Sequence, residues 1–261
     1  MHCAIPRRTA VTLGLLTLGL FQPANGQQQV VHRSDTIVNV SSKAVLLSAG
    51  VVAVAFLLDR KTANTFEGSY GPSTASAANT FNKFGEVTGI GVVLGGLGVA
   101  SLITRKHHTV QTLLRVTTGV AVATGITSGL KYAFGRDRPY ADADHDGLDF
   151  HPFRGVAAGS PSFPSGHTTI AFAMATSLGD AVGNTWAKVG LWGLATGTAW
   201  ARMQLDQHWL SDVAVGAAIG IMSAKFGDGR IKILGVRPPR FVMPDRTTVG
   251  LAWTIPAPMV R

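Results

Sequence analysis

The chain has a single cysteine, Cys3, and only 14% of its 261 residues are charged. Soluble domains average about 25% charged residues, so this composition lies between that of a compact helical bundle and that of a membrane protein. Cys3 belongs to an N-terminal segment that we expect to be removed, which would leave the mature chain without a thiol. That absence excludes disulfides, thiol catalysis and cysteine metal sites.

Residues 1–26 have the pattern of a secretory signal peptide. Arg7 and Arg8 precede an uncharged run over 10–21, and the small residues Ala24-Asn25-Gly26 follow it. A first transmembrane helix is the alternative, but about 12 apolar residues fall short of the roughly 20 that span a bilayer. Cleavage would take the formal charge from +9 to +7, which fits an anionic substrate or membrane surface. No nucleic-acid partner is expected, because the charge is scattered and no recognition motif is present.

Six uncharged stretches, rich in Ala, Gly, Val and Leu, are long enough to form helices rather than strands. They are Ala44–Leu58, Val87–Thr104, Val116–Leu130, Thr168–Gly179, Val189–Ala201 and Val213–Ala224. We therefore predict an all-α fold, a six-helix bundle over 43–228 that follows a linker over 27–42. Residues 60–83 and 135–164 are expected to be connections between helices.

The segment 229–261 has a different character. Its prolines break any helix, and Val249, Leu251, Trp253 and Ile255 alternate with small residues. This alternation predicts a short C-terminal tail with a β-hairpin pattern.

Polar residues gather at the ends of the predicted helices. Following the helices in order, they are Lys131 and Arg138 after the third, His167 at the start of the fourth, Arg202 at the end of the fifth, and His208 and Asp212 before the sixth. In an up-and-down bundle these four helix ends lie at the same end of the molecule. We therefore expect the residues to converge on one patch.

This patch has the composition of a phosphate site. Lys131, Arg138 and Arg202 supply three cations, and the arginines can bind a phosphate through two parallel hydrogen bonds. The helix that begins at Ser165 and Gly166 adds backbone N–H groups and a hydroxyl that face an anion.

The same patch contains a candidate nucleophile. His208 and Asp212 are four residues apart and share a helix face, so the carboxylate can hold one ring nitrogen and leave the other free to attack. His167 is the candidate general acid. Each of these residues also has a plain structural explanation, as a solvated helix end, a packed histidine or a helix cap. Those explanations do not account for the position of all of them at one end.

Three spaced motifs resemble those of the type 2 phosphatidic acid phosphatases, which share a superfamily with vanadium haloperoxidases and bacterial class A acid phosphatases. The motifs are Lys131 with Arg138-Pro139, then Pro164-Ser165-Gly166-His167, then Arg202 with His208 and Asp212. They cover roughly residues 130–226, and three spaced motifs are far more specific than one short pattern. The family usually has a serine where this chain has Ala201, so a hydroxyl that supports the arginine is missing.

The resemblance implies a phosphatase that hydrolyses phosphate monoesters or diphosphates, with a phosphorylated lipid or a small phosphate ester as substrate. It implies that His208 forms a phosphohistidine, that Asp212 orients His208, and that His167 protonates the leaving oxygen. Ser165, Gly166 and the three cations would hold the phosphate oxygens, so no metal or other cofactor is expected. A vanadium-dependent haloperoxidase and a non-catalytic membrane protein that binds phosphate or lipid are the alternatives.

A run of aspartates lies between the first two motifs. Asp142, Asp144, Asp146 and Gly147 match the start of a calcium-binding loop, but position twelve is Phe153, so the closing glutamate is absent. An acidic surface loop near the site is favoured, and a calcium site is the alternative.

The distribution of basic residues bears on where the site faces. If the signal peptide is cleaved and all six stretches span a membrane, the site faces the cytoplasm. Arg105, Lys106 and Arg115 then lie outside, against the positive-inside rule. Thr168–Gly179, with 12 residues, is also shorter than the roughly 20 of a span. We therefore expect a protein of the bacterial cell envelope, membrane-associated or periplasmic, whose site faces the periplasm.

Overall fold

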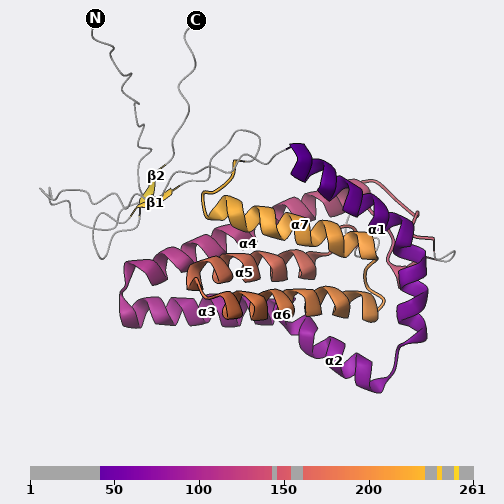
Figure 1. Cartoon of the computed structure of the whole chain (residues 1–261), viewed down its shortest axis with the longest axis horizontal. Coiled ribbons are helices and arrows are strands. Elements are labelled where there is room, and N and C mark those ends of the chain that lie inside the picture. The colour runs from indigo at the N-terminus through magenta and orange to yellow at the C-terminus, as the bar shows by residue number, and fades with distance from the viewer. Residues whose placement is uncertain (1–41, 143–145, 154–160, 233–239, 243–249, 253–261) are drawn as a thin grey trace, which may run out of the picture.

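The computed structural model describes residues 42–142, 146–153, 161–232, 240–242 and 250–252, and the predicted signal peptide lies outside them. The described part of the chain is all-α apart from one short pair of strands (Figure 1). Its helices are α1 (Ser42–Gly68), α2 (Pro72–Asn82), α3 (Val87–Thr104), α4 (His107–Phe134), α5 (Gly166–Val182), α6 (Thr185–Gln204) and α7 (Leu210–Gly227). Two short 3-10 turns, η1 (Lys83–Gly85) and η2 (Pro139–Ala141), follow α2 and α4.

The described residues form seven α-helices, so the predicted number of six was one too few. Residues 60–83, which we expected to be a connection, contain the last third of α1 and all of α2. α1 continues through Asp59, which is buried and paired with Arg136, and through Arg60, which is exposed. α2 begins at Pro72, which suits the first position of a helix, and the side chain of Thr74 accepts a hydrogen bond from the N–H of Gly71 at 2.9 Å at this helix start.

α5 runs through the middle of the bundle and packs against α4, α6 and α7 (Figure 1). Ala173 and Met174 of α5 pack with Val116 of α4 in one apolar cluster. Phe172 packs with Ala195 of α6 in a second cluster on another side of α5. Because its apolar residues are buried on more than one side, α5 forms the core that fixes the positions of the surrounding helix ends.

Glycines bring α5 and α7 into close contact. A Cβ atom at Gly216 would lie 2.7 Å from the carbonyl oxygen of Ser165, and one at Gly220 would lie 2.3 Å from that of Thr169. Only residues without a side chain allow the two backbones to approach this closely. The same approach lets the N–H of Ser165 donate to the carbonyl oxygen of Asp212 at 3.0 Å, so the first turns of α5 and α7 are joined.

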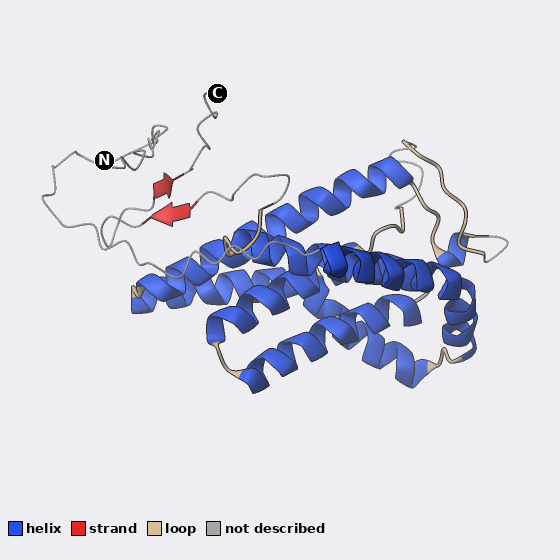
Figure 2. Cartoon of the chain, turned by 45° about the horizontal axis from the view of Figure 1, so that its top comes forward, coloured by secondary structure: helices blue, strands red, loops and turns tan. Residues whose placement is uncertain are grey.

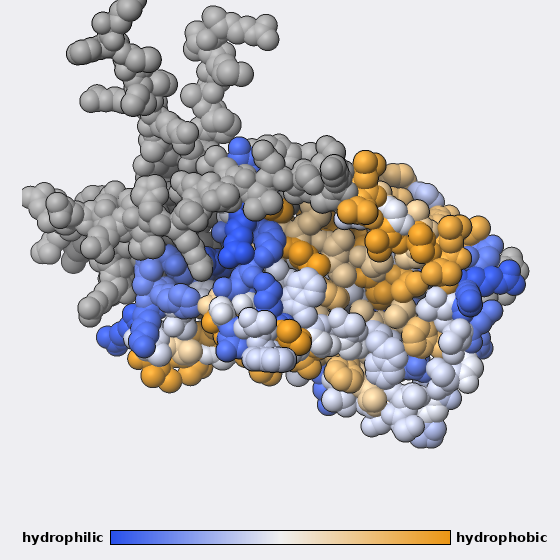
Figure 3. All heavy atoms as spheres, in the orientation of Figure 1, coloured by the Kyte–Doolittle hydropathy of each residue, from blue (hydrophilic) through white to orange (hydrophobic). Residues whose placement is uncertain are grey.

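The outer surface of the helical domain is strongly apolar. α3, α4 and α7 are long and apolar enough to cross a membrane. α3 has no fully buried residue, and its Val87, Leu102 and Ile103 are each more than three-quarters exposed. Hydrophobic residues also cover α1 (Figure 3), where Leu57 is 83% exposed. Hydrocarbon is the solvent that suits such a surface, and the protein is therefore membrane-associated.

The C-terminal residues that the structure describes form the β-like tail that the alternating pattern predicted. β1 (Arg240–Val242) pairs antiparallel with β2 (Gly250–Ala252), and Phe241 lies opposite Leu251 (Figure 2). Of the four alternating residues, only Leu251 lies within the described strands.

Candidate active site

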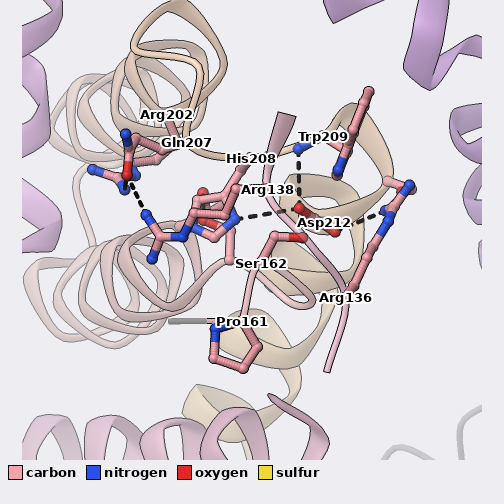
Figure 4. Close-up of polar contacts among 12 residues, drawn as sticks. Arg136, Arg138, Pro161, Ser162, Arg202, Gln207, His208, Trp209 and Asp212 are labelled. Atoms are coloured by element: carbon pink, nitrogen blue, oxygen red, sulfur yellow. Dashed lines mark hydrogen bonds and ion pairs between the residues drawn. The ribbon is translucent and has the colours of Figure 1, made fainter. Parts of the chain in front are cut away.

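The four helix ends that carry the predicted site residues meet at one end of the bundle. Figure 4 shows residues from three parts of the chain lying together there. They are Arg136 and Arg138 after α4, Pro161 and Ser162 before α5, and, from the last turn of α6 to the first turn of α7, Arg202, Gln207, His208, Trp209 and Asp212. The connections between these helices bring their ends together because α4, α5, α6 and α7 alternate in direction.

His208 and Asp212 form a buried pair. His208 is 3% exposed and Asp212 is fully buried, and Nδ1 of the histidine lies 3.3 Å from Oδ2 of the aspartate. The same Oδ2 accepts a hydrogen bond from the backbone N–H of Trp209 at 2.9 Å. A carboxylate at Nδ1 favours the tautomer that leaves the lone pair of Nε2 available for attack.

Arg138 and Arg202 are joined through one amide oxygen. Oε1 of Gln207 accepts a hydrogen bond from Nη1 of Arg138 and another from Nη2 of Arg202, the second at 3.3 Å. Asn82 of α2 accepts from Nη1 of Arg202 at 3.0 Å and donates to Glu86. The Nε atom of Arg202 is buried without a hydrogen-bond partner among the described residues. A phosphate oxygen is the kind of acceptor that fits between two such guanidinium groups.

Lys131 completes the group of cations. Its ammonium donates to the carbonyl oxygens of Pro161 and Ser162, the second at 3.1 Å. This contact places the end of α4 beside the segment that leads into α5. The positive charges of Lys131, Arg138 and Arg202 are all close enough to act on His208.

The N-terminus of α5 faces this patch. Gly166 and His167 occupy the first two helical positions, where backbone N–H groups have no acceptor within the helix. The hydroxyl of Ser165 is fully buried and lies 2.9 Å from that of Thr168. η1 packs against this turn so closely that a Cβ atom at Gly85 would lie 2.5 Å from the carbonyl oxygen of His167. The turn is therefore held in place from outside the helix.

Burial and positive charge keep both histidines neutral. Burial is the main cause that lowers the pKa of His167 to about 4, and Arg202, Arg138 and Lys131 lower it further. Burial likewise holds the pKa of His208 well below its usual range, with Lys131 as the next cause. A neutral His208 is the form that can act as a nucleophile. A general acid at His167 requires a proton, which an anion bound beside the three cations would favour.

The aspartate-rich segment is not simply a surface loop. Asp142 is 2% exposed, and its Oδ2 accepts a hydrogen bond from the N–H of Gly147 at 3.0 Å. Asp146 is exposed, and Asp144 lies outside the described residues. Among the residues that the structure describes, no group of three or more His, Cys, Asp or Glu side chains could hold a metal ion.

Sequence reasoning missed two charged residues next to the site. Arg136 donates to Oδ1 of Asp212 at 2.9 Å, and Asp59 of α1 accepts from Arg136 at 2.7 Å. Arg136 lies inside the first motif, between Lys131 and Arg138, and Asp59 directly follows the first uncharged stretch. A lone acidic residue at the end of an apolar run was the one available signal for Asp59.

The chain is similar in sequence or fold to several known proteins. Lipid A 1-phosphatase of Porphyromonas gingivalis is 37% identical over 111 residues, which are 42% of this chain and 21% of the relative. The chain thus spans about a fifth of the length of that protein. Two solved structures are similar. LpxE of Aquifex aeolicus has a TM-score of 0.48 and 22% identity over 65% of this chain and 94% of its own. A transmembrane PAP2-type phosphatidylglycerolphosphate phosphatase of Bacillus subtilis has a TM-score of 0.53 and 17% identity. This match covers 73% of this chain and 96% of the other.

The second of these structures shares the fold of this helical domain. The model of the PAP2 superfamily matches residues 112–227, from α4 to the end of α7, and this range contains all the predicted site residues. Residues 112–227, which are less than half of the chain, thus match the PAP2 superfamily.

Proposed function

We propose that the protein is a phosphatase that hydrolyses phosphate monoesters or diphosphates of lipids through a phosphohistidine at His208. The observation that carries this proposal is a buried histidine, held by Asp212 at Nδ1, beside a patch where three cations meet a helix N-terminus. A site that only bound phosphate would need the cations and the helix but not the oriented histidine.

The reaction takes two steps. In the first, Nε2 of His208 attacks phosphorus, the P–O bond to the leaving group breaks, and His167 gives its proton to the leaving oxygen. In the second, His167 takes a proton from water, whose oxygen attacks phosphorus and releases inorganic phosphate from Nε2. The cations and the first turn of α5 stabilise the negative charge on the phosphate oxygens in both steps.

Apolar surface beside the site supports a lipid substrate. Leu57 precedes Asp59 on α1 and is 83% exposed, and Leu148 follows Gly147 and is 67% exposed. Tyr140, which is 57% exposed, is close enough to act on the charges of Arg138 and Arg202. Acyl chains suit such a surface better than water does. The name of the relative in Porphyromonas gingivalis, lipid A 1-phosphatase, makes lipid A the first substrate to test.

The proposal is tested by phosphate release from purified protein in detergent. The panel contains lipid A, phosphatidic acid, phosphatidylglycerol phosphate, undecaprenyl diphosphate and 4-nitrophenyl phosphate. We expect turnover of at least one lipid at a higher kcat/KM than that of the nitrophenyl ester, survival of activity in chelators, and inhibition by vanadate. If none of these substrates releases phosphate, the proposal is wrong. Oxidation of bromide by peroxide after vanadate loading would favour a haloperoxidase, and lipid binding without turnover would favour a binding protein.

We also propose that the site faces the periplasm after removal of the signal peptide. The end of the bundle opposite the site carries Arg105 and Lys106 between α3 and α4, and Lys225 and Arg230 at and after the end of α7. Figure 3 shows hydrophilic residues gathered at that end. An excess of basic residues favours the cytoplasmic side. α1 is not among the helices with the composition of a span, so an external N-terminus is compatible with an external site.

Cysteine labelling in intact cells tests this orientation. Leu148→Cys lies at the site end, and Lys106→Cys lies at the opposite end; both residues are exposed. A thiol reagent that cannot cross the inner membrane should label the first variant only, and the wild-type chain should give background if Cys3 is removed with the signal peptide. Labelling of Lys106→Cys alone would place the site in the cytoplasm.

A further inference from the structure

Arg136 connects α1 to the carboxylate that holds His208. Its side chain is 1% exposed. Nη1 donates to Oδ1 of Asp212 at 2.9 Å, and Nη2 donates to Oδ2 of Asp59 at 2.7 Å. Asp212 therefore has one oxygen on Arg136 and the other on His208 (Figure 4). The arginine fixes the rotation of the carboxylate that faces the nucleophile.

The guanidinium of Arg136 is fully engaged. Nε and Nη2 both donate to the carbonyl oxygen of Gly147, at 2.9 Å and 2.6 Å, and Nη1 also donates to Oγ of Ser211 at 2.7 Å. With the two carboxylates, these contacts use all five N–H groups that an arginine has. Three aromatic rings lie within cation–π distance of it, with centroids 5.0 to 5.3 Å away: Phe56, Phe150 and Trp209. No donor is left over for a phosphate, so Arg136 does not act as a fourth phosphate ligand.

Asp59 fixes the beginning of α7. Its Oδ1 accepts from the backbone N–H of Ser211 at 2.8 Å, and its Oδ2 accepts from the hydroxyl of Ser211 at 2.6 Å. Ser211 is the second residue of α7, where N–H groups lack an acceptor within the helix and favour a negative partner. Asp59, which is 1% exposed, therefore holds both the arginine and the helix that carries Asp212.

The charges of this group matter for the nucleophile. Arg136 alone would neutralise Asp212, and the neutral pair would stabilise a positively charged imidazole only weakly. Asp59 adds a second carboxylate. Burial raises its pKa, and hydrogen bonds from Arg136 and Ser211 act in the opposite direction. With both carboxylates ionised, the three side chains together have one net negative charge beside His208. A histidine that has accepted a phosphoryl group and keeps its Nδ1 proton carries positive charge on the ring, which this net charge stabilises.

We propose that Asp59 and Arg136 are positioning residues for catalysis. Arg136 orients Asp212 toward Nδ1 of His208, and Asp59 offsets the charge of Arg136 so that Asp212 retains its effect on the phosphohistidine. The inference rests on the proposed phosphatase function. It extends the site beyond the range 112–227, since Asp59 lies in α1.

The test separates phosphoryl transfer from phosphate binding. Asp59→Asn keeps the size of the side chain and removes its charge. With 4-nitrophenyl phosphate in rapid-quench experiments, we expect phosphoenzyme formation to slow about tenfold to a hundredfold, as for other residues that orient a catalytic group. The inhibition constant of inorganic phosphate should stay unchanged, because Lys131, Arg138 and Arg202 do not contact Asp59. A purely structural role would change both quantities or neither.

Two further variants guard against a folding defect. Asp59→Asn combined with Arg136→Met removes the charges of Asp59 and Arg136, so no uncompensated arginine is left among the aromatic rings, and Asp212 keeps its hydrogen bond from the N–H of Trp209. It should fold, bind inorganic phosphate as the wild type does, and still form phosphoenzyme slowly, because Oδ1 of Asp212 has lost its donor. Asp180→Asn is the matched control. Asp180 is a partly buried aspartate that accepts from Lys188 at 2.8 Å at the other end of the bundle, and its loss should leave the rate per folded molecule unchanged.

Two outcomes would overturn the inference. One is wild-type phosphoenzyme formation per folded molecule in the double variant or in Asp59→Asn. The other is an equal loss of phosphate binding and of rate. If the proposed phosphatase function is itself wrong, the wild-type protein will form no phosphoenzyme with any substrate. That result is distinct from both outcomes above.

Discussion

Nδ1 of His208 lies 3.3 Å from Oδ2 of Asp212, and both side chains are buried in the protein. This relationship leaves Nε2 as the nitrogen that can accept a phosphoryl group. We expect His208→Ala to form no phosphoenzyme and to lose turnover by at least about ten-thousandfold. His151→Ala is a matched control, since His151 also pairs with an aspartate, Asp137, at 3.2 Å but has a side chain 42% exposed. Phosphoenzyme in the first variant, or equal losses in both, would contradict the assignment.

The role of His167 depends on the leaving group. A general acid matters most when the departing oxygen is strongly basic. We therefore expect His167→Ala to slow the hydrolysis of an alkyl phosphate by about a hundredfold or more and that of 4-nitrophenyl phosphate much less. Steady-state kcat for the two esters, measured in the same preparation, gives the comparison. Equal losses for both would remove His167 from the acid role.

The pH dependence follows from the charges around His167. In the protein alone its pKa is lowered to about 4 by burial and then by Arg202, Arg138 and Lys131. A phosphate dianion bound at the same cations raises that pKa. The alkaline limb of kcat, which reports the enzyme–substrate complex, should therefore lie at higher pH than the alkaline limb of kcat/KM. An alkyl phosphate is the suitable substrate. The idea fails if the two limbs coincide or if His167→Gln leaves the alkaline limb of kcat in place.

Motif spacing and helix direction were enough to predict that four helix ends meet. The spacing places His208 and Asp212 on one helix face, and the apolar stretches give the order of the helices on which α5 and α7 lie. These are local properties of the chain, so they can be read without a structure. The proposed catalytic roles are still to be measured.

The part that the sequence did not predict depends on distant contacts. Asp59 and Ser211 are 152 residues apart, and no local pattern shows that α1 packs against the start of α7. Arg136 lies between two motif residues, but its environment depends on the return of the chain at Gly147 and Phe150. α2 was missed for a different reason: its residues are small and polar, so they form no apolar run.

Oε1 of Gln207 lies between Arg138 and Arg202 and accepts a hydrogen bond from each. We propose that a phosphate oxygen takes this position when substrate binds. A carboxylate there would form charge-assisted hydrogen bonds to both guanidinium groups and compete with substrate. We expect Gln207→Glu to raise KM and the inhibition constant of inorganic phosphate by about tenfold or more. Gln207→Ala removes the amide without adding charge and should have a much smaller effect on both. The same KM in the two variants would show that Gln207 does not lie where phosphate binds.

The contact between α5 and α7 should be the least tolerant part of the bundle. A Cβ atom at Gly220 would lie 2.3 Å from the carbonyl oxygen of Thr169, so α7 would have to move away from α5. Overpacking of this kind costs about 2 kcal/mol or more. Gly220→Ala should therefore lower the midpoint of thermal unfolding in detergent, and kcat should fall because the first turn of α7 carries Asp212. Gly190→Ala on α6 is the matched control, since nothing lies within 4 Å of a Cβ atom there. Because alanine has a higher helix propensity than glycine, Gly190→Ala should raise the free energy of unfolding by about 0.5 kcal/mol or more. A Gly220→Ala protein as stable and as active as Gly190→Ala would show that α5 and α7 are not held together at this distance.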